Sequence, residues 1–242
     1  MNETMRGSGS GGDEAAAWRA RLGWTFGLIA DDPAERATAL EHLDRARSNT
    51  QDALDRFNEL WHLTRPLGPE EQYQELAFRR AGEVYHNVRR RSFPDGLWDG
   101  NRGAGVMGWP GLPYAVLFLE WEARFPREWT AHAKAWSTKQ VLIRSMASAD
   151  HDQQLRTKLT DLVEIVVQRA YRCKDREYVR VARAVDNEDL RRRLGTAAAS
   201  ENPWARLHAG YVLRLLNRPE LPNTQYTWRT WLAATSGGQQ CL

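Results

Sequence analysis

Apolar residues recur every three or four positions along most of the chain, which is typical of amphipathic helices. In the first such segment, Trp18, Leu22 and Phe26 lie four residues apart. A second begins at Asp32-Pro33, where Asp is a favoured N-cap and Pro a favoured first helical residue. No stretch shows the two-residue alternation of a β-strand. The sequence therefore predicts an all-α multi-helix bundle.

The predicted helices fill a single helical domain over residues 14–236, between tails at 1–13 and 237–242 that we predict to be disordered. That domain is subdivided into 14–91, a connecting loop at 92–113, and 114–236. The last three helices are also compatible with a short solenoid-like stack of helix pairs. The predicted helices span residues 14–29, 33–64, 69–91, 114–125, 126–146, 150–186, 188–199, 203–216 and 224–234.

The helix predicted at 150–186 has one irregular feature. The apolar face of residues 155–166 is rotated by about 100° from that of residues 167–185. Either this helix bends near Val167 to Tyr171, or that stretch is buried all round, or the segment forms two helices.

Residues 92–113 interrupt the helical pattern, because six glycines and three prolines fall within 22 positions. Loops of this length in compact domains are usually functional or disordered. We expect Trp98 and Trp109 to anchor the segment while Asn101, Arg102 and the following glycines stay mobile. The segment is thus a candidate binding edge or lid, and the alternative is a plain connector.

Charge is distributed unevenly along the chain. Residues 1–76 hold 8 basic and 14 acidic side chains, whereas residues 77–242 hold 26 basic and 17 acidic. The imbalance favours either a negatively charged partner for the C-terminal part or contact between the two parts.

A basic stripe is the strongest functional pattern in the sequence. The stripe consists of Arg169, Arg172, Arg176, Arg180 and Arg183. Their spacings of three, four, four and three residues place them on one side of a continuous helix. Guanidinium groups suit bidentate contacts with phosphate. Neighbouring acidic residues such as Asp175 and Glu177 could instead neutralise them. The candidate nucleic-acid or partner-binding residues are Arg169, Arg172, Arg176, Arg180, Arg183, Arg191, Arg192 and Arg193.

Two Glu-x-x-His motifs, Glu59/His62 and Glu83/His86, have the spacing used by di-iron helical bundles. On a helical wheel both pairs lie opposite the apolar arc and should face solvent. No metal, cofactor or catalytic residue is therefore predicted. Cys173 and Cys241 have neither metal-ligand spacing nor a reason to pair.

No run of 18 apolar residues is present, so no membrane partner is predicted and a cytoplasmic location is expected. The pattern favours a non-enzymatic helical accessory protein that contacts nucleic acid or a nucleoprotein through its C-terminal Arg-rich surface. One alternative is a protein-interaction or regulatory scaffold that binds an acidic protein surface. Another is an enzyme whose pocket is capped by residues 92–113. The sequence does not predict an oligomeric state.

Overall fold

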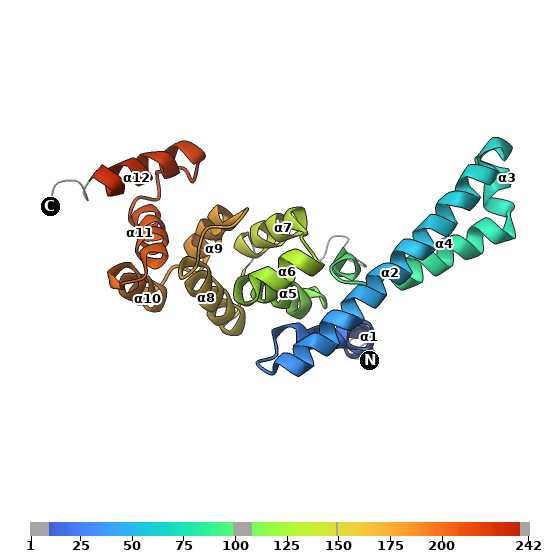
Figure 1. The fold of residues 1–242 in the computed structure, drawn as a ribbon, viewed down its shortest axis with the longest axis horizontal. Coiled ribbons are helices and arrows are strands. Elements are labelled where there is room, and N and C mark those ends of the chain that lie inside the picture. Colours follow the sequence, from blue (N-terminus) through green and yellow to red (C-terminus); the bar gives the residue numbers. More distant parts are fainter. Residues whose placement is uncertain (1–9, 99–107, 149, 238–242) are drawn as a thin grey trace, which may run out of the picture. The chain divides into compact units, whose positions relative to one another are not determined.

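The computed structural model describes residues 10–98, 108–148 and 150–237, and within these ranges every regular element is a helix (Figure 1). The predicted all-α fold is confirmed. The described chain divides into two compact units. Unit 1 contains residues 10–98 and 108–134, and unit 2 contains residues 135–148 and 150–237. The boundary between the two units thus lies after residue 134 and not within the predicted loop at 92–113.

Unit 1 begins with α1 (Ser10–Leu22) and the 3-10 helix η1 (Gly23–Ile29). The helix starts before residue 14, so residues 10–13 are not part of a disordered tail, and the rest of the predicted tail lies outside the described residues. The next helix, α2 (Pro33–Thr64), has the predicted bounds. Its N-cap is Asp32, whose Oδ1 accepts a hydrogen bond of 3.0 Å from the backbone N–H of Ala34.

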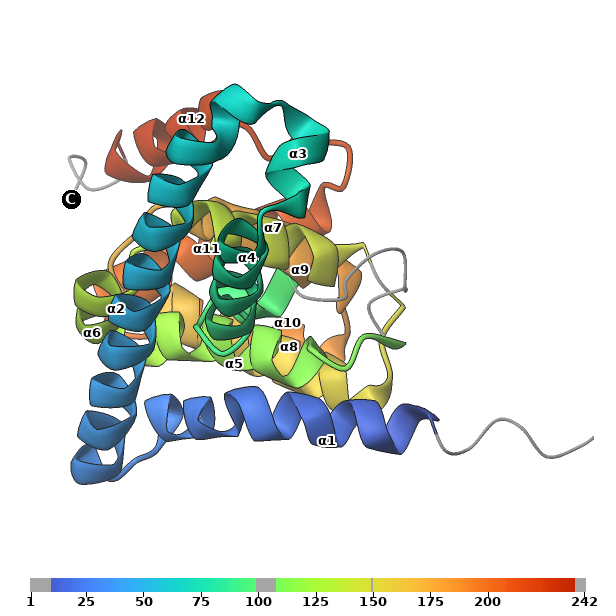
Figure 2. The same cartoon turned by 90° about the vertical axis from the view of Figure 1, so that its right-hand side faces the viewer.

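A helical hairpin forms the second part of unit 1, and Figure 1 and Figure 2 show α2 beside α4 within it. The predicted helix at 69–91 is wrong as a single element, because Glu75 has extended backbone angles (φ −64°, ψ 112°) and separates two helices. The Phe57 ring of α2 lies 5.1 Å from Phe78 and 6.0 Å from Tyr85 between ring centroids. The hairpin continues from α2 through η2 (Arg65–Leu67) and α3 (Pro69–Gln74) to α4 (Leu76–Arg89).

The core of unit 1 surrounds α5 (Leu112–Arg124), which is followed by α6 (Pro126–His132). Phe118, Trp121 and Trp129 are fully buried there. The predicted loop contributes to this core, since it contains the short helix η3 (Asp95–Trp98) and the buried residue Trp109. Large aromatic side chains therefore stabilise this unit by burial of apolar area.

Unit 2 contains the remaining helices. The predicted helix at 126–146 is divided, because Lys134 has a positive φ of 49° between α6 and α7. The predicted helix at 150–186 is also wrong as one element, since α8 ends at Val167 and α9 begins at Tyr178. The elements are α7 (Trp136–Ala147), α8 (Gln153–Val167), η5 (Asp175–Glu177), α9 (Tyr178–Ala184), α10 (Glu188–Ala199), α11 (Pro203–Asn217) and α12 (Gln225–Gly237).

Within unit 2, α10 packs along α11, and α11 also contacts α8, α9 and α12. A solenoid-like repeat of these helices stays a prediction. Among the described helices, none combines the length and apolar character needed to cross a bilayer.

Candidate binding site in unit 2

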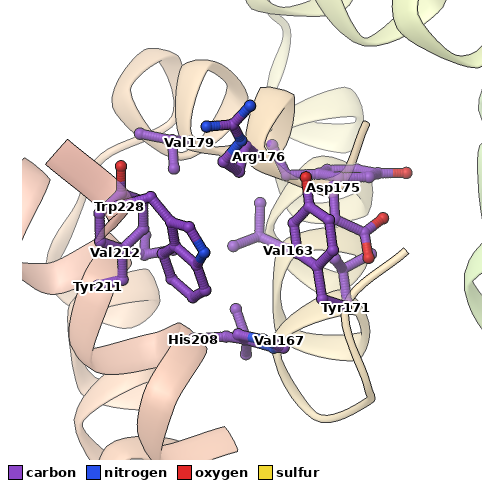
Figure 3. Close-up of a pocket in the computed structure, with 12 residues that line it drawn as sticks. Val163, Val167, Tyr171, Asp175, Arg176, Val179, His208, Tyr211, Val212 and Trp228 are labelled. Carbon is purple, nitrogen blue, oxygen red and sulfur yellow. The ribbon is translucent and has the colours of Figure 1, made fainter. Parts of the chain in front are cut away.

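A small cavity in unit 2 is lined by residues of α8, α9, α11 and α12 and of the segment that joins α8 to α9 (Figure 3). Its volume is about 40 Å³, which is enough for a few water molecules or for the end of one side chain. Five valines make most of its aliphatic lining. They are Val163, Val166, Val167, Val179 and Val212.

Aromatic rings form the sides of the cavity. Figure 3 shows Tyr171 and Trp228 on opposite sides, with ring centroids 6.2 Å apart and planes inclined by 25°. Tyr211 meets Trp228 edge to face at 4.8 Å. His208 and Tyr211, three residues apart, project from the same side of α11. The site is thus an aromatic slot with an aliphatic base.

The aromatic surface extends outward from the cavity. Trp204 stacks on His208 with ring centroids 6.0 Å apart, and its side chain is 46% exposed. Tyr171 is 42% exposed. We call Tyr171, Trp204, His208, Tyr211 and Trp228 the aromatic cluster. Contiguous exposed aromatic surface of this kind is typical of interaction sites.

A buried ion network holds the segment that carries Tyr171. Lys139 of α7 is fully buried, and its Nζ donates to Asp175 Oδ1 over 2.6 Å and to the carbonyl of Cys173 over 3.2 Å. Asp175 Oδ2 accepts from Arg169 Nη1 at 2.8 Å and from the backbone N–H of Arg172 at 2.7 Å. We call Lys139, Arg169 and Asp175 the Asp175 network. It fixes the non-helical path between α8 and α9.

Burial controls protonation at the cavity. It lowers the pKa of His208, and the charge of Asp175 opposes this shift only in part. The imidazole is therefore uncharged at neutral pH. Burial also raises the pKa of Tyr211, whose hydroxyl donates to Asn223 Oδ1 over 3.1 Å. Asn223 Nδ2 in turn donates to the carbonyl of Arg176 over 2.6 Å.

Arg176 has an unusual environment. Its Nη1 atom is buried and has no hydrogen-bond partner in the part of the chain that the structure describes. Figure 3 shows its side chain at the edge of the cavity, with the guanidinium group directed away from the rings of Tyr171 and Trp228. Buried donors are normally satisfied, but this atom has almost no exposed surface through which a ligand could reach it.

The predicted basic stripe does not exist as a helix face. Arg169 and Arg172 lie between α8 and α9, Arg176 lies in η5, and only Arg180 and Arg183 belong to α9. Arg169 is held by Asp175, and the Arg172 guanidinium lies 5.2 Å from the centre of the Trp136 ring.

Most of the other predicted arginines also form hydrogen bonds or ion pairs within the protein. Arg183 Nη2 donates to the carbonyls of Leu215 and Leu221, at 3.1 and 2.8 Å. Arg191 pairs with Asp186 at 2.7 Å, while Arg193 Nη1 lies 2.9 Å from both Asp161 and Glu164. Arg180 and Arg192 are the more exposed members, and they pair with Glu177 and Asp189.

Trp98 and Trp109, the described members of the predicted loop site, belong to unit 1 and do not line this cavity. Trp109 is 5% exposed and meets Trp18 edge to face with ring centroids 6.0 Å apart, which confirms its anchoring role. Trp98 is half-buried at the end of η3. Asn101 and Arg102 lie outside the described residues, so their predicted mobility stays a prediction.

The Glu-x-x-His side chains are exposed on the hairpin of unit 1, as the helical wheel predicts. Across the described ranges, no group of three or more His, Cys, Asp and Glu side chains is placed to hold a metal ion. Cys173 is exposed with a free thiol, and Cys241 lies outside the described residues.

Sequence reasoning missed the aromatic cluster, and it assigned Tyr171 to a buried helix face. The signal present in the sequence is the spacing of Trp204, His208 and Tyr211 by four and three residues, which places an aromatic edge along α11. Comparison with protein-family models, with curated proteins and with solved structures found no match for the chain.

Proposed function

We propose that this protein is a binding module that captures an acidic segment of a partner protein, with one apolar side chain of that segment in the cavity of unit 2. The observation that carries the proposal is the aromatic cluster, of which Tyr171 and Trp204 are exposed, around a small, aliphatic-based cavity. Aromatic side chains at the edge of a desolvated pocket are the usual energetic centre of protein interfaces.

Cavity size argues for a side chain rather than a free metabolite. Pockets for drug-sized ligands and cofactors have volumes of roughly 300–1,000 Å³. The cavity here has about 40 Å³ and can hold only the end of an inserted group. The rest of such a partner would lie across the exposed rings of Tyr171 and Trp204.

Charge argues for an acidic partner. Residues 135–242 contain 17 basic and 11 acidic side chains and carry a net charge of +6. Around the cavity, the single carboxylate of Asp175 is already engaged by Lys139 and Arg169. Arg176 also lines the cavity, and its positive charge would favour a carboxylate in the part of the partner that lies beside the inserted side chain.

Nucleic-acid contact through the arginines stays a second prediction. The internal pairing of Arg169, Arg183 and Arg193 makes it the weaker one, because a guanidinium that holds the fold together is not free to neutralise phosphate. Arg180 and Arg192, with side chains 56% and 70% exposed, are the members best placed to make such contacts.

Fluorescence anisotropy with labelled peptides tests the proposal. The probes are short peptides with a central Leu, Phe or Trp flanked by Glu, and matched peptides with Gln in place of Glu. The acidic peptides should bind, and Tyr171→Ala should weaken binding by at least about tenfold. Replacing Arg176 by Met should weaken the acidic peptides and should leave the Gln peptides unchanged.

The matched control is Tyr226→Ala, since Tyr226 lies on α12 with Trp228 but is 79% exposed and does not line the cavity. This variant should bind like the wild type. Absence of peptide binding, or equal loss in Tyr171→Ala and Tyr226→Ala, would contradict the proposal. Tight binding of short labelled RNA or DNA, falling steeply with salt and weakened by replacing Arg180 and Arg192, would favour the nucleic-acid prediction instead.

A further inference from the structure

The helical hairpin of unit 1 exposes apolar side chains. Leu63 on α2 is 73% exposed, and Val84 on α4 is 54% exposed. Both helices are long enough to present a continuous side, since α4 has 14 residues and α2 has 32. Exposed apolar surface over two adjacent helices indicates an interaction site.

Helix geometry places these side chains together. Phe57 and Phe78 define the sides on which α2 and α4 pack against each other. At 100° per residue, the apolar residues flanking these two contacts fall on the same side of the antiparallel pair. We call this side the hairpin face. Its apolar positions are Ala53, Leu60 and Leu63 of α2 and Ala77, Ala81, Val84 and Val88 of α4, and Arg56 of α2, paired with Glu59 at 3.0 Å, lies among them.

The opposite side of the hairpin is different in character. A groove there is lined by Phe57 and Tyr73 together with the polar residues Arg79, Glu83 and His86. The groove side thus carries more polar side chains than the hairpin face. Three of the seven apolar positions of the hairpin face are alanines, which lets another helix approach closely.

Charge differs between the two helices of the hairpin. Residues 51–64 of α2 contain three acidic side chains and one Arg, whereas α4 contains three Arg and one Glu. Next to the hairpin face, Glu59 lies on the outer edge of α2 and Arg80 on the outer edge of α4. Each hairpin thus has one acidic and one basic edge.

We propose that two copies of this chain associate through their hairpin faces to form a four-helix bundle. A two-fold axis parallel to the helices places α2 of one copy on α4 of the other, with every neighbouring pair antiparallel. Glu59, which pairs with Arg56 of its own helix at 3.0 Å, then also lies beside Arg80 of the other copy. An axis perpendicular to the helices would place α2 on α2 and bring like charges together, so the charges select the first arrangement.

The size of the hairpin face sets the strength of this association. A helix of 14 residues is about 21 Å long, and two packed helices are about 20 Å wide, so the face covers about 400 Å² per copy. The total of about 800 Å² is below that of stable protein complexes. Interfaces of this size belong to weak, transient complexes, so we expect dissociation in the micromolar range and not a stable dimer.

Sedimentation equilibrium of the full-length chain at roughly 5–500 µM tests this proposal. The wild type should change from monomer to dimer across that range. Leu63→Glu and Val84→Glu should each raise the dissociation constant at least about 100-fold, because each places a charge in both halves of the interface. Both side chains are exposed in the monomer, so circular dichroism should be unchanged.

Four further variants separate self-association through the hairpin face from non-specific association of the hairpin. The control Tyr73→Glu lies on the groove side, where Tyr73 is 69% exposed, and should dimerise like the wild type. Glu59→Arg and Arg80→Glu should each weaken the dimer, and the double variant should restore it. A wild type that stays monomeric, a Tyr73→Glu variant that is equally impaired, or a double variant without recovery would each overturn the proposal.

Discussion

The Asp175 network provides the sharpest test of how unit 2 is held together. Asp175→Asn keeps the shape of the side chain and removes the charge that Lys139 and Arg169 share. Lys139 has no exposed surface, so its ammonium group would lose the carboxylate that it contacts at 2.6 Å and could not turn to water instead. Arg169, with 15% of its side chain exposed, can still reach water.

The magnitude follows from burial. Removing one partner of a buried ion pair costs about 3–5 kcal/mol, mostly because the other charge is left unpaired. That is a large fraction of the 5–15 kcal/mol of a typical domain. We expect Asp175→Asn to lower the free energy of unfolding of unit 2 by about this amount. Lys139→Met should cost less, because it leaves Asp175 paired with Arg169.

The double variant Lys139→Met/Asp175→Asn identifies the cause, because it removes the buried ammonium group together with its carboxylate partner. It should be more stable than Asp175→Asn alone. Urea denaturation followed by circular dichroism measures all four proteins, and a separate transition for each unit would allow the effect to be assigned. A loss below about 1 kcal/mol in Asp175→Asn, or no recovery in the double variant, would refute the reasoning.

Two other residues of unit 2 give independent tests. Burial alone would raise the pKa of Glu177, but hydrogen bonds from Arg144 and Gln140 and the charges of Arg144 and Arg180 outweigh it and lower the pKa from 4.5 to about 2. Because the folded state favours the Glu177 carboxylate, its stabilising effect should be present above pH 4.5 and lost as the pH falls towards 2. The difference in melting temperature between wild type and Glu177→Gln should therefore shrink on acidification. Arg183→Gln should cost about 1–3 kcal/mol, because the carbonyls of Leu215 and Leu221 lose a charged donor. The exposed replacement Arg180→Gln should change the free energy of unfolding by no more than about 0.5 kcal/mol in the same denaturation assay.

Local signals in the sequence were sufficient for the helices that start at a capping residue followed by proline. Asp32-Pro33 and Asn202-Pro203 predict the starts of α2 and α11, and both capping side chains accept the expected backbone hydrogen bonds. These interactions lie within a few residues of each other along the chain. The exposure of the Glu-x-x-His side chains was likewise predictable, because it follows from helical periodicity alone.

Tertiary contacts decided the path between α8 and α9, where the sequence predicted one helix. No Gly or Pro occurs in residues 168–174, and the change in apolar face is compatible with either a bend or a break. The break is held by partners distant in sequence, since Lys139 reaches Asp175 from 36 residues away and Asn202 Nδ2 donates to the carbonyl of Gln168 from 34 residues away. The same break removes the arginine stripe and places Tyr171 opposite Trp228. Short-range periodicity therefore determined where most helices form. The end of α8 was decided instead by the burial of Lys139 beside the distant carboxylate of Asp175. A buried charge without a partner costs more free energy than one helical turn contributes.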